Sequence, residues 1–262
     1  MENTILSKNY WKSACGEAKK LRMLMFAALC CALTVVIGSM YVVVGDNLRV
    51  YFTCFIIAVG CSVYGPVLGA LVAVVTDTLN FILFPSGAYF PGYMIAEVIA
   101  AVIYGAFLYR TRISVVKIYC ARMIVNYLCN VLLGSLWSSI LFGKGYLYYL
   151  VTSLVKNTLL LPFEAIIMAL LFSMLIPVFS RFGLMPVHGE KELQRLKLSS
   201  SVFTVFGISC ILGALCSLYY STTQENPVVF YVLAAVLVLG AVGLFVGGIV
   251  FRRRRAKKQS ES

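Results

Sequence analysis

Helix-length runs of apolar residues alternate with short polar segments along the whole chain. We place candidate membrane spans at about residues 23–44, 50–64, 66–84, 93–109, 118–141, 149–176, 202–220 and 228–251. Continuous apolar runs of this length are typical of membrane-spanning helices. The pattern predicts an all-α, polytopic membrane protein. We divide it into an N-terminal cytoplasmic segment (1–22), a membrane domain (23–180), a cytoplasmic linker (181–201), two further spans (202–251) and a polybasic cytoplasmic tail (252–262).

Two acids interrupt the apolar pattern of the third and fourth spans. Gly65-Pro66 predicts a tight turn between the second and third spans. The third span then carries Asp77, a stiff aromatic turn follows at 84–92 (FPSGAYFPG), and the fourth span carries Glu97. An acid near the bilayer centre costs about 2.5–3.5 kcal/mol even on the lenient insertion scale, so an intramembrane carboxylate indicates a functional site.

Further polar and aromatic groups fall in the same half of the membrane as these acids, by residue counting along the spans. This half is the one that faces outside when the N-terminus is cytoplasmic. The candidate site residues are Arg49, Asp77, Asn80, Tyr89, Phe90, Glu97, Asn130, Trp137, Lys156 and Asn157. Their one-sided distribution favours a shared pocket that opens to the outside. Within it, Arg49 and Lys156 would offset the charges of the acids.

Structural explanations remain open for several of these residues. The charged groups also fit an internal ion-pair network that only fixes helix packing, and Trp137 fits an interfacial aromatic. Arg122, near the cytoplasmic end of its span, is interpreted as a side chain that reaches the inner headgroups. Glu164 either answers the polarity left by Pro162 or pairs with Lys156 two turns away.

Composition and charge placement support the membrane assignment and exclude other classes. Hydrophobic residues make up 61% of the chain and charged residues 12%, well below the roughly 25% of soluble domains. Most of the 22 basic residues lie in segments on one side, which is the positive-inside bias of cytoplasmic loops and not a nucleic-acid footprint. Eight of the nine cysteines lie in or beside apolar runs, and no C-x-x-C pair occurs.

No catalytic, nucleotide-binding or metal-binding motif occurs, and we expect neither a cofactor nor a metal. The outer-half groups instead match a binding site for a planar, hydrogen-bonding solute. Aromatic rings would stack on its faces, carboxylates would accept its N–H groups, and cations would bind its acids.

Two stretches carry a family resemblance. YGPVLGALVAVVTDTLNFILFPSGAYFPGYMIAEVIAAVIYGAFLYR (64–110) and RMIVNYLCNVLLGSLWSSILFGKGY (122–146) resemble the substrate-binding S components of energy-coupling factor (ECF) vitamin transporters, in the folate-type subgroup. The resemblance covers about residues 20–180. It implies a six-helix bundle that captures a folate-class vitamin from outside. Delivery would depend on a transmembrane coupling subunit and two ATPase subunits.

The resemblance also assigns a role to the first span. Ala28 and Ala32 present small residues at i, i+4, which on spacing alone suits packing against a neighbour within the protein. The family's Ala-x-x-x-Ala face matches these two alanines, which implies contact with the coupling subunit. One departure is that residues 181–262 add a linker and two spans to the family's six. Extra helices of this kind would be able to cover a surface that faces the coupling module.

Three alternatives accompany this interpretation. The same scaffold would suit another vitamin or a queuosine precursor. A membrane-embedded enzyme would use Asp77 and Glu97 as acid and base. A protein that serves only packing or assembly would bind no small molecule.

Overall fold

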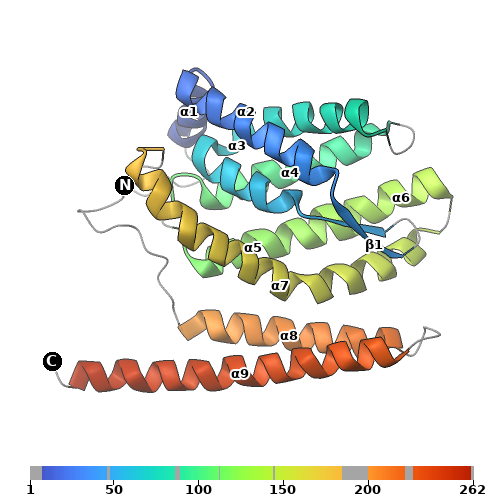
Figure 1. The fold of residues 1–262 in the computed structure, drawn as a ribbon, viewed down its shortest axis with the longest axis vertical. Helices are drawn as coiled ribbons and strands as arrows, with labels where there is room; N and C mark the ends of the chain where they lie inside the picture. Colours follow the sequence, from blue (N-terminus) through green and yellow to red (C-terminus); the bar gives the residue numbers. More distant parts are fainter. Residues whose placement is uncertain are drawn as a thin grey trace.

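The computed structural model describes residues 8–45, 48–85, 89–111, 113–143, 145–184, 200–221 and 227–260 (Figure 1). Within these residues, six helices are long and apolar enough to cross a membrane. They are Leu21–Gly38, Thr53–Leu83, Pro91–Leu108, Val115–Phe142, Tyr146–Arg181 and Val202–Tyr219. The all-α prediction is confirmed, with one short β-hairpin added. The elements are α1 (Lys8–Glu17), α2 (Leu21–Gly38), β1 (Tyr41–Gly45), β2 (Leu48–Tyr51), α3 (Thr53–Leu83), α4 (Pro91–Leu108), α5 (Val115–Ile124), η1 (Val125–Leu133), α6 (Gly134–Phe142), α7 (Tyr146–Arg181), α8 (Ser200–Ser221) and α9 (Pro227–Ser260).

The long helix α3 is folded back on itself at the predicted Gly65-Pro66 turn. Gly65 has φ 84°, a backbone conformation that residues with a Cβ rarely adopt. As a result, both ends of α3 reach the end of α2: a Cβ added to Gly38 would lie 3.2 Å from Asn80 Oδ1 and 3.5 Å from Thr53 Cγ2. The two arms therefore correspond to the second and third predicted spans.

The first predicted span (23–44) extends too far. Helix α2 ends at Gly38, and the valines that follow form β1, which pairs antiparallel with β2 in the register Tyr41↔Tyr51 and Val43↔Arg49. A run of β-branched residues favours a strand over a helix where packing does not decide. Apolarity alone does not distinguish the two.

The fifth predicted span (118–141) is a continuous helical segment of α5, η1 and α6. Its middle part, η1, is a π-helix that contains Asn126 and Asn130. Wide helical turns of this kind are rare and occur often at functional sites. The stretch is therefore a structural marker that periodicity does not reveal.

Helix α1 closes the end of the bundle where α3 turns. The Tyr10 hydroxyl donates a hydrogen bond to the Gly105 carbonyl (2.8 Å), and Tyr10 packs edge-on against Tyr109. Glu17 is 3% exposed and forms ion pairs with Lys20 (2.9 Å) and Arg110 (2.8 Å). Helix α1 is thus a structured cap on the bundle.

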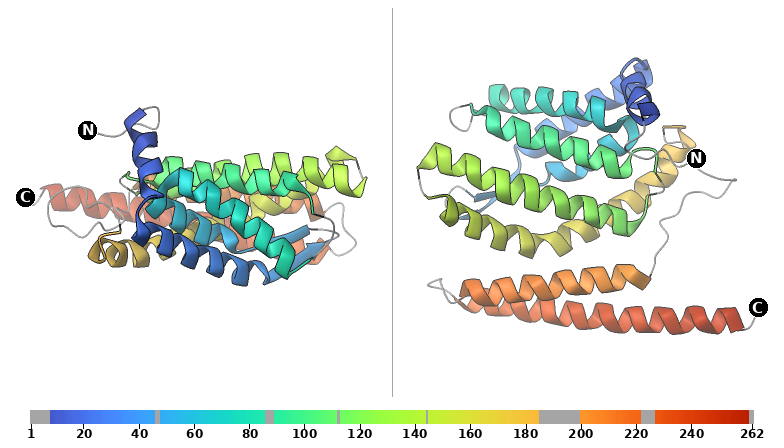
Figure 2. Two further views of the ribbon diagram at one scale, coloured as in Figure 1. Left: turned by 90° about the horizontal axis from the view of Figure 1, so that it is seen from above. Right: turned by 180° about the vertical axis from the view of Figure 1, so that it is seen from behind.

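Helices α8 and α9 form an antiparallel pair that lies along α7, on the far side of the bundle from α2 (Figures 1 and 2). Helix α9 continues as a helix through the basic residues predicted as a tail. The C-terminal end of α9 lies at the same end of the molecule as α1, whereas the β-hairpin and α6 lie at the opposite end (Figure 1).

Candidate ligand site

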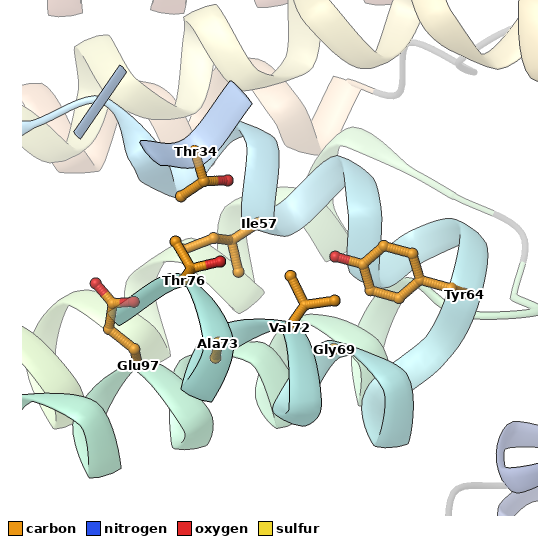
Figure 3. Close-up of a pocket in the computed structure, with 8 residues that line it drawn as sticks. All are labelled: Thr34, Ile57, Tyr64, Gly69, Val72, Ala73, Thr76 and Glu97. Atoms are coloured by element: carbon orange, nitrogen blue, oxygen red, sulfur yellow. The ribbon is translucent and has the colours of Figure 1, made fainter. Parts of the chain in front are cut away.

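A small cavity lies between the two arms of α3, α2 and α4, and Glu97 lies at one end of it (Figure 3). Its volume is about 10 Å³, room for roughly one water molecule. Thr34 and Thr76 line it near Glu97, and Tyr64 lies at its other end (Figure 3). Neither threonine hydroxyl donates to Glu97: Thr34 donates to the Cys30 carbonyl, and Thr76 to Cys31 Sγ.

The Glu97 carboxylate consequently has an unused hydrogen-bonding oxygen. Its Oε2 atom is fully buried and has no partner among the described residues. A buried polar atom without a partner costs about 1–3 kcal/mol, and more when it is charged. An N–H donor on a solute would satisfy it.

Asp77 lies close enough to Glu97 for their charges to interact. The Tyr89 side chain lies near the Asp77 carboxylate, while its hydroxyl donates to Met94 Sδ (3.4 Å) and its ring packs against Phe81 with a centroid separation of 5.0 Å. Asn80 lies one turn further along and packs on Gly38. Asp77, Tyr89 and Glu97 therefore lie near one another, whereas Asn80 lies against α2, and of these four only Glu97 lines the cavity.

Two of the candidate aromatic residues, Phe90 and Trp137, pack against each other. The rings of Phe90 and Trp137 lie 5.6 Å apart between centroids, and Phe90 directly precedes α4. Trp137 Nε1 is buried without a hydrogen-bond partner in the described part of the chain, as are the hydroxyls of Ser135 and Tyr149. Three unpartnered polar groups thus gather where α6 meets the start of α7.

Arg122 does not reach the headgroups, and that interpretation is wrong. It is 3% exposed and forms a buried ion pair with Glu164, with Nη2 2.7 Å and Nε 2.9 Å from Oε2. Arg122 also donates to the Tyr104 hydroxyl (3.0 Å). Burial of a guanidinium requires partners of this kind, and α4 and α7 supply them.

Three asparagine side chains extend this polar network from the ion pair toward the end of the bundle where α6 lies. Asn126 donates to Glu164 Oε2 (3.0 Å), and Asn130 donates to Asn126 (2.9 Å) and to Asn157 (3.3 Å). Lys156, beside Asn157 on α7, interacts electrostatically with Glu164 and Arg122. Asn130, Lys156 and Asn157 therefore belong to one polar network with Glu164.

The predicted residues thus form two groups and not one. Asp77, Asn80, Tyr89 and Glu97 lie around the arms of α3 and α4, whereas Asn130, Lys156 and Asn157 lie between η1 and α7. Phe90 and Trp137 connect α4 with α6. The sequence left two possibilities for Lys156, which were to offset the two acids or to pair with Glu164. In the structure it interacts electrostatically with Glu164 and Arg122. Arg49 lies on β2, and its side chain is outside the described residues.

Sequence reasoning missed two contributors. Tyr104, which accepts a hydrogen bond from Arg122, lies in an apolar run, and nothing in the sequence indicates this contact. Asn126, which donates to Glu164, is indicated only by its i, i+4 spacing from Arg122.

Ala28 and Ala32 lie on an exposed face of α2, together with Met25, Leu29 and Val36. The interpretation that these alanines pack against a neighbour within the protein is wrong. The α8–α9 pair leaves this face uncovered, so the extra helices do not occupy it.

Comparison with known proteins gives a consistent result. Residues 22–183 match the family described as "ECF transporter, substrate-specific component". The folate transporter FolT of Clostridium novyi is 32% identical over 149 residues, which cover 57% of this chain and 87% of the relative. FolT of Leuconostoc mesenteroides is 26% identical over 171 residues, 63% of this chain and 88% of that protein. The crystal structure of FolT bound with folic acid shares the fold, with a TM-score of 0.53, 24% identity and coverage of 57% of this chain and 91% of that one.

Proposed function

This chain belongs to the family of substrate-specific components of ECF transporters, and from that premise we propose that it captures folate or a reduced folate from outside the cell. Proteins of this family are transporter components and not enzymes, so acid–base catalysis by Asp77 and Glu97 is not proposed. The chain is a multi-pass membrane protein.

The observation that carries the proposal is the buried Glu97 Oε2, which has no hydrogen-bond partner in the described part of the chain, beside a second acid and on the helix that follows the Phe90–Trp137 aromatic pair. Phe90 and Glu97 are seven residues apart, or about 10 Å along a helix. A pterin is a flat ring that carries several N–H donors on one edge. A pterin therefore matches a site in which aromatic rings can stack on it and a carboxylate can accept its N–H hydrogen bonds.

We assign roles from this chemistry. Glu97 and Asp77 accept hydrogen bonds from the pterin, and Phe90 and Trp137 stack against it or against the adjacent benzoyl ring. The glutamate carboxylates of the solute bind the cations Lys156 and Arg49. Asn80, Tyr89 and Asn130 complete the lining.

The cavity of about 10 Å³ is far smaller than the roughly 300 Å³ or more that a solute of this size fills. Binding therefore requires movement, and we assign it to the β-hairpin, which lies at the end of the bundle opposite α1. Loops that close over a ligand are common in binding proteins.

Delivery to the cell interior rests on partners. Ala28 and Ala32 offer a surface on which a coupling subunit can approach closely, and two ATPase subunits supply the energy. The placement of basic residues puts both termini on the cytoplasmic side of a bacterial plasma membrane, with the ligand site toward the outside.

Tryptophan fluorescence tests the proposed ligand directly. The chain has two tryptophans, so Trp11→Phe leaves Trp137 as the sole reporter. Folate added to this variant should quench the emission with saturable dependence on concentration, and riboflavin or thiamine should not. In parallel, mass spectrometry of the purified protein should detect a bound folate. A different vitamin or a queuosine precursor in the mass spectrum, with no folate quenching, would reject folate as the ligand.

A further inference from the structure

Helix α7 lacks one backbone hydrogen bond at Pro162, and α8 packs against α7 in the turn that precedes this proline. Proline has no N–H, so the carbonyl of Thr158, four residues earlier, lacks its helical donor. The views in Figures 1 and 2 show α7 curved along its length, with α8 beside it. A helix turn whose carbonyl lacks its i+4 donor deforms more easily, so neighbouring helices can determine its local geometry.

Gly213 brings the backbone of α8 against this carbonyl. A Cβ added to the buried Gly213 would lie 3.6 Å from the Thr158 carbonyl oxygen and 3.9 Å from Leu159 Cα. It would also lie 3.3 Å from Leu237 Cδ1 on α9. A methyl group fits within small adjustments, whereas a longer side chain would push α8 away from α7.

Side chains strengthen the same contact. The Cys216 side chain lies beside that of Thr158, and Leu159 packs on the α8–α9 core. Nearer the other end of α8, the rings of Phe206 and Tyr119 meet at 5.3 Å between centroids. Helix α8 therefore contacts α5 and α7 together and holds them in one relative position.

The opposite face of the same turn of α7 carries candidate ligand-site residues. The Thr158 hydroxyl also lies 3.1 Å from the Tyr127 hydroxyl on η1. Its neighbour Asn157 accepts the hydrogen bond from Asn130, and Lys156 precedes it. One helical turn thus faces α8 on one side and the polar network on the other.

We propose that α8 is a positioning element for the ligand site, which sets the geometry of α7 at Thr158–Pro162 through Gly213 and so places Lys156 and Asn157. This inference rests on the proposed function for its effect on ligand affinity. It assigns a role to the two helices that lie beyond the segment matched by the family.

The test uses the full-length protein in lipid nanodiscs and compares Gly213→Leu with Gly240→Leu. Gly240, on α9, has nothing within 4 Å of an added Cβ and is the matched control. Gly213→Leu should speed amide hydrogen exchange in residues 154–164 of α7 and weaken folate binding by about tenfold. Gly213→Ala should stay close to wild type. Adding Leu237→Ala to Gly213→Leu should return both the exchange rate of α7 and the folate affinity toward wild type, because it makes room for the added side chain.

Two measurements keep the outcomes separate. If the wild-type protein does not bind folate, the proposed function fails, and the exchange data still decide whether α8 sets the geometry of α7. Exchange in Gly213→Leu equal to that of Gly240→Leu would overturn the proposal. Faster exchange with unchanged folate affinity would also overturn it, since α8 would then stabilise α7 without placing the site.

Discussion

The Arg122 guanidinium and the Glu164 carboxylate meet in the interior of the bundle, 2.7 Å apart and 42 residues apart in sequence. Glu164 Oε2 also accepts from Asn126, which has no exposed surface. This oxygen is therefore the centre of a polar network that links α4, α5, η1 and α7.

Arg122→Leu should destabilise the protein strongly, because it leaves the Glu164 carboxylate buried without its counter-charge. Removal of one partner of a buried ion pair costs about 3–5 kcal/mol. The double variant Arg122→Leu/Glu164→Leu should lose less, since it buries no unpaired charge. Thermal unfolding followed by circular dichroism measures both, and equal losses in the two variants would contradict the buried pair.

Glu97→Gln should weaken folate binding without a large change in stability. A hydrogen bond to a charged group contributes about 1.5–3 kcal/mol, or roughly a tenfold to hundredfold change in Kd. The matched control is Glu17→Gln, at the opposite end of the bundle, which should bind folate as wild type does. Titration calorimetry provides the comparison, and equal affinities in the two variants would remove Glu97 from the site.

Ala28→Leu and Ala32→Leu should abolish uptake while folate binding by the purified protein remains normal. Both alanines are exposed, so the added side chains meet nothing within the chain, but they prevent close approach of a partner helix. Ala235→Leu makes the same change at an exposed site on α9 and should transport normally. Uptake of labelled folate by cells that contain the coupling module is the readout. Normal uptake by both α2 variants would exclude this face as the docking surface.

Acidification should release α1 from the bundle end. Burial alone raises the pKa of Glu17, but hydrogen bonds from Lys20, Arg110 and Tyr109 outweigh it and hold that pKa below the usual 4.5. A lowered pKa contributes stability that is complete above the ordinary value and is lost as the pH falls through the folded value. Docking of α1 should therefore be constant at neutral pH and weaken progressively below about pH 4.5.

Trp11, which packs edge-on against Tyr10, reports this release. In a Trp137→Phe background, its emission should change as the pH falls through the acidic range. Glu17→Gln removes the titrating group, so the change should disappear in that variant. Persistence of the same acidic transition in Glu17→Gln would show that another group controls it.

Local patterns predicted much of the architecture. Apolar runs of helix length identified the membrane helices because lipid leaves the backbone few other ways to satisfy its hydrogen bonds. The Gly65-Pro66 pair predicted the reversal within α3. Glycine permits a positive φ and proline fixes φ, and both effects are independent of the rest of the fold. The valines of β1 were the main error, because a short apolar run fits a strand and a helix equally well.

The candidate site was predictable as a list and not as an arrangement. An acid in an apolar run carries a desolvation cost wherever it lies, so Asp77 and Glu97 stand out in the sequence alone. The partners that meet that cost come from other helices, and only packing selects them. Arg122 was therefore interpreted as a headgroup anchor although it meets Glu164. For Lys156, the sequence left open whether it offsets Asp77 and Glu97 or pairs with Glu164.

By itself, the sequence determined the class of the protein, the order of its helices and the residues too polar to be placed in lipid without cause. Each of these depends on interactions within one segment or between a segment and its solvent. The tertiary structure decided which of those residues share a network, which buried carboxylate oxygen has no partner among the described residues, and which face of α2 remains uncovered. These depend on helix rotations and crossings, which arise from the simultaneous packing of segments far apart in the chain.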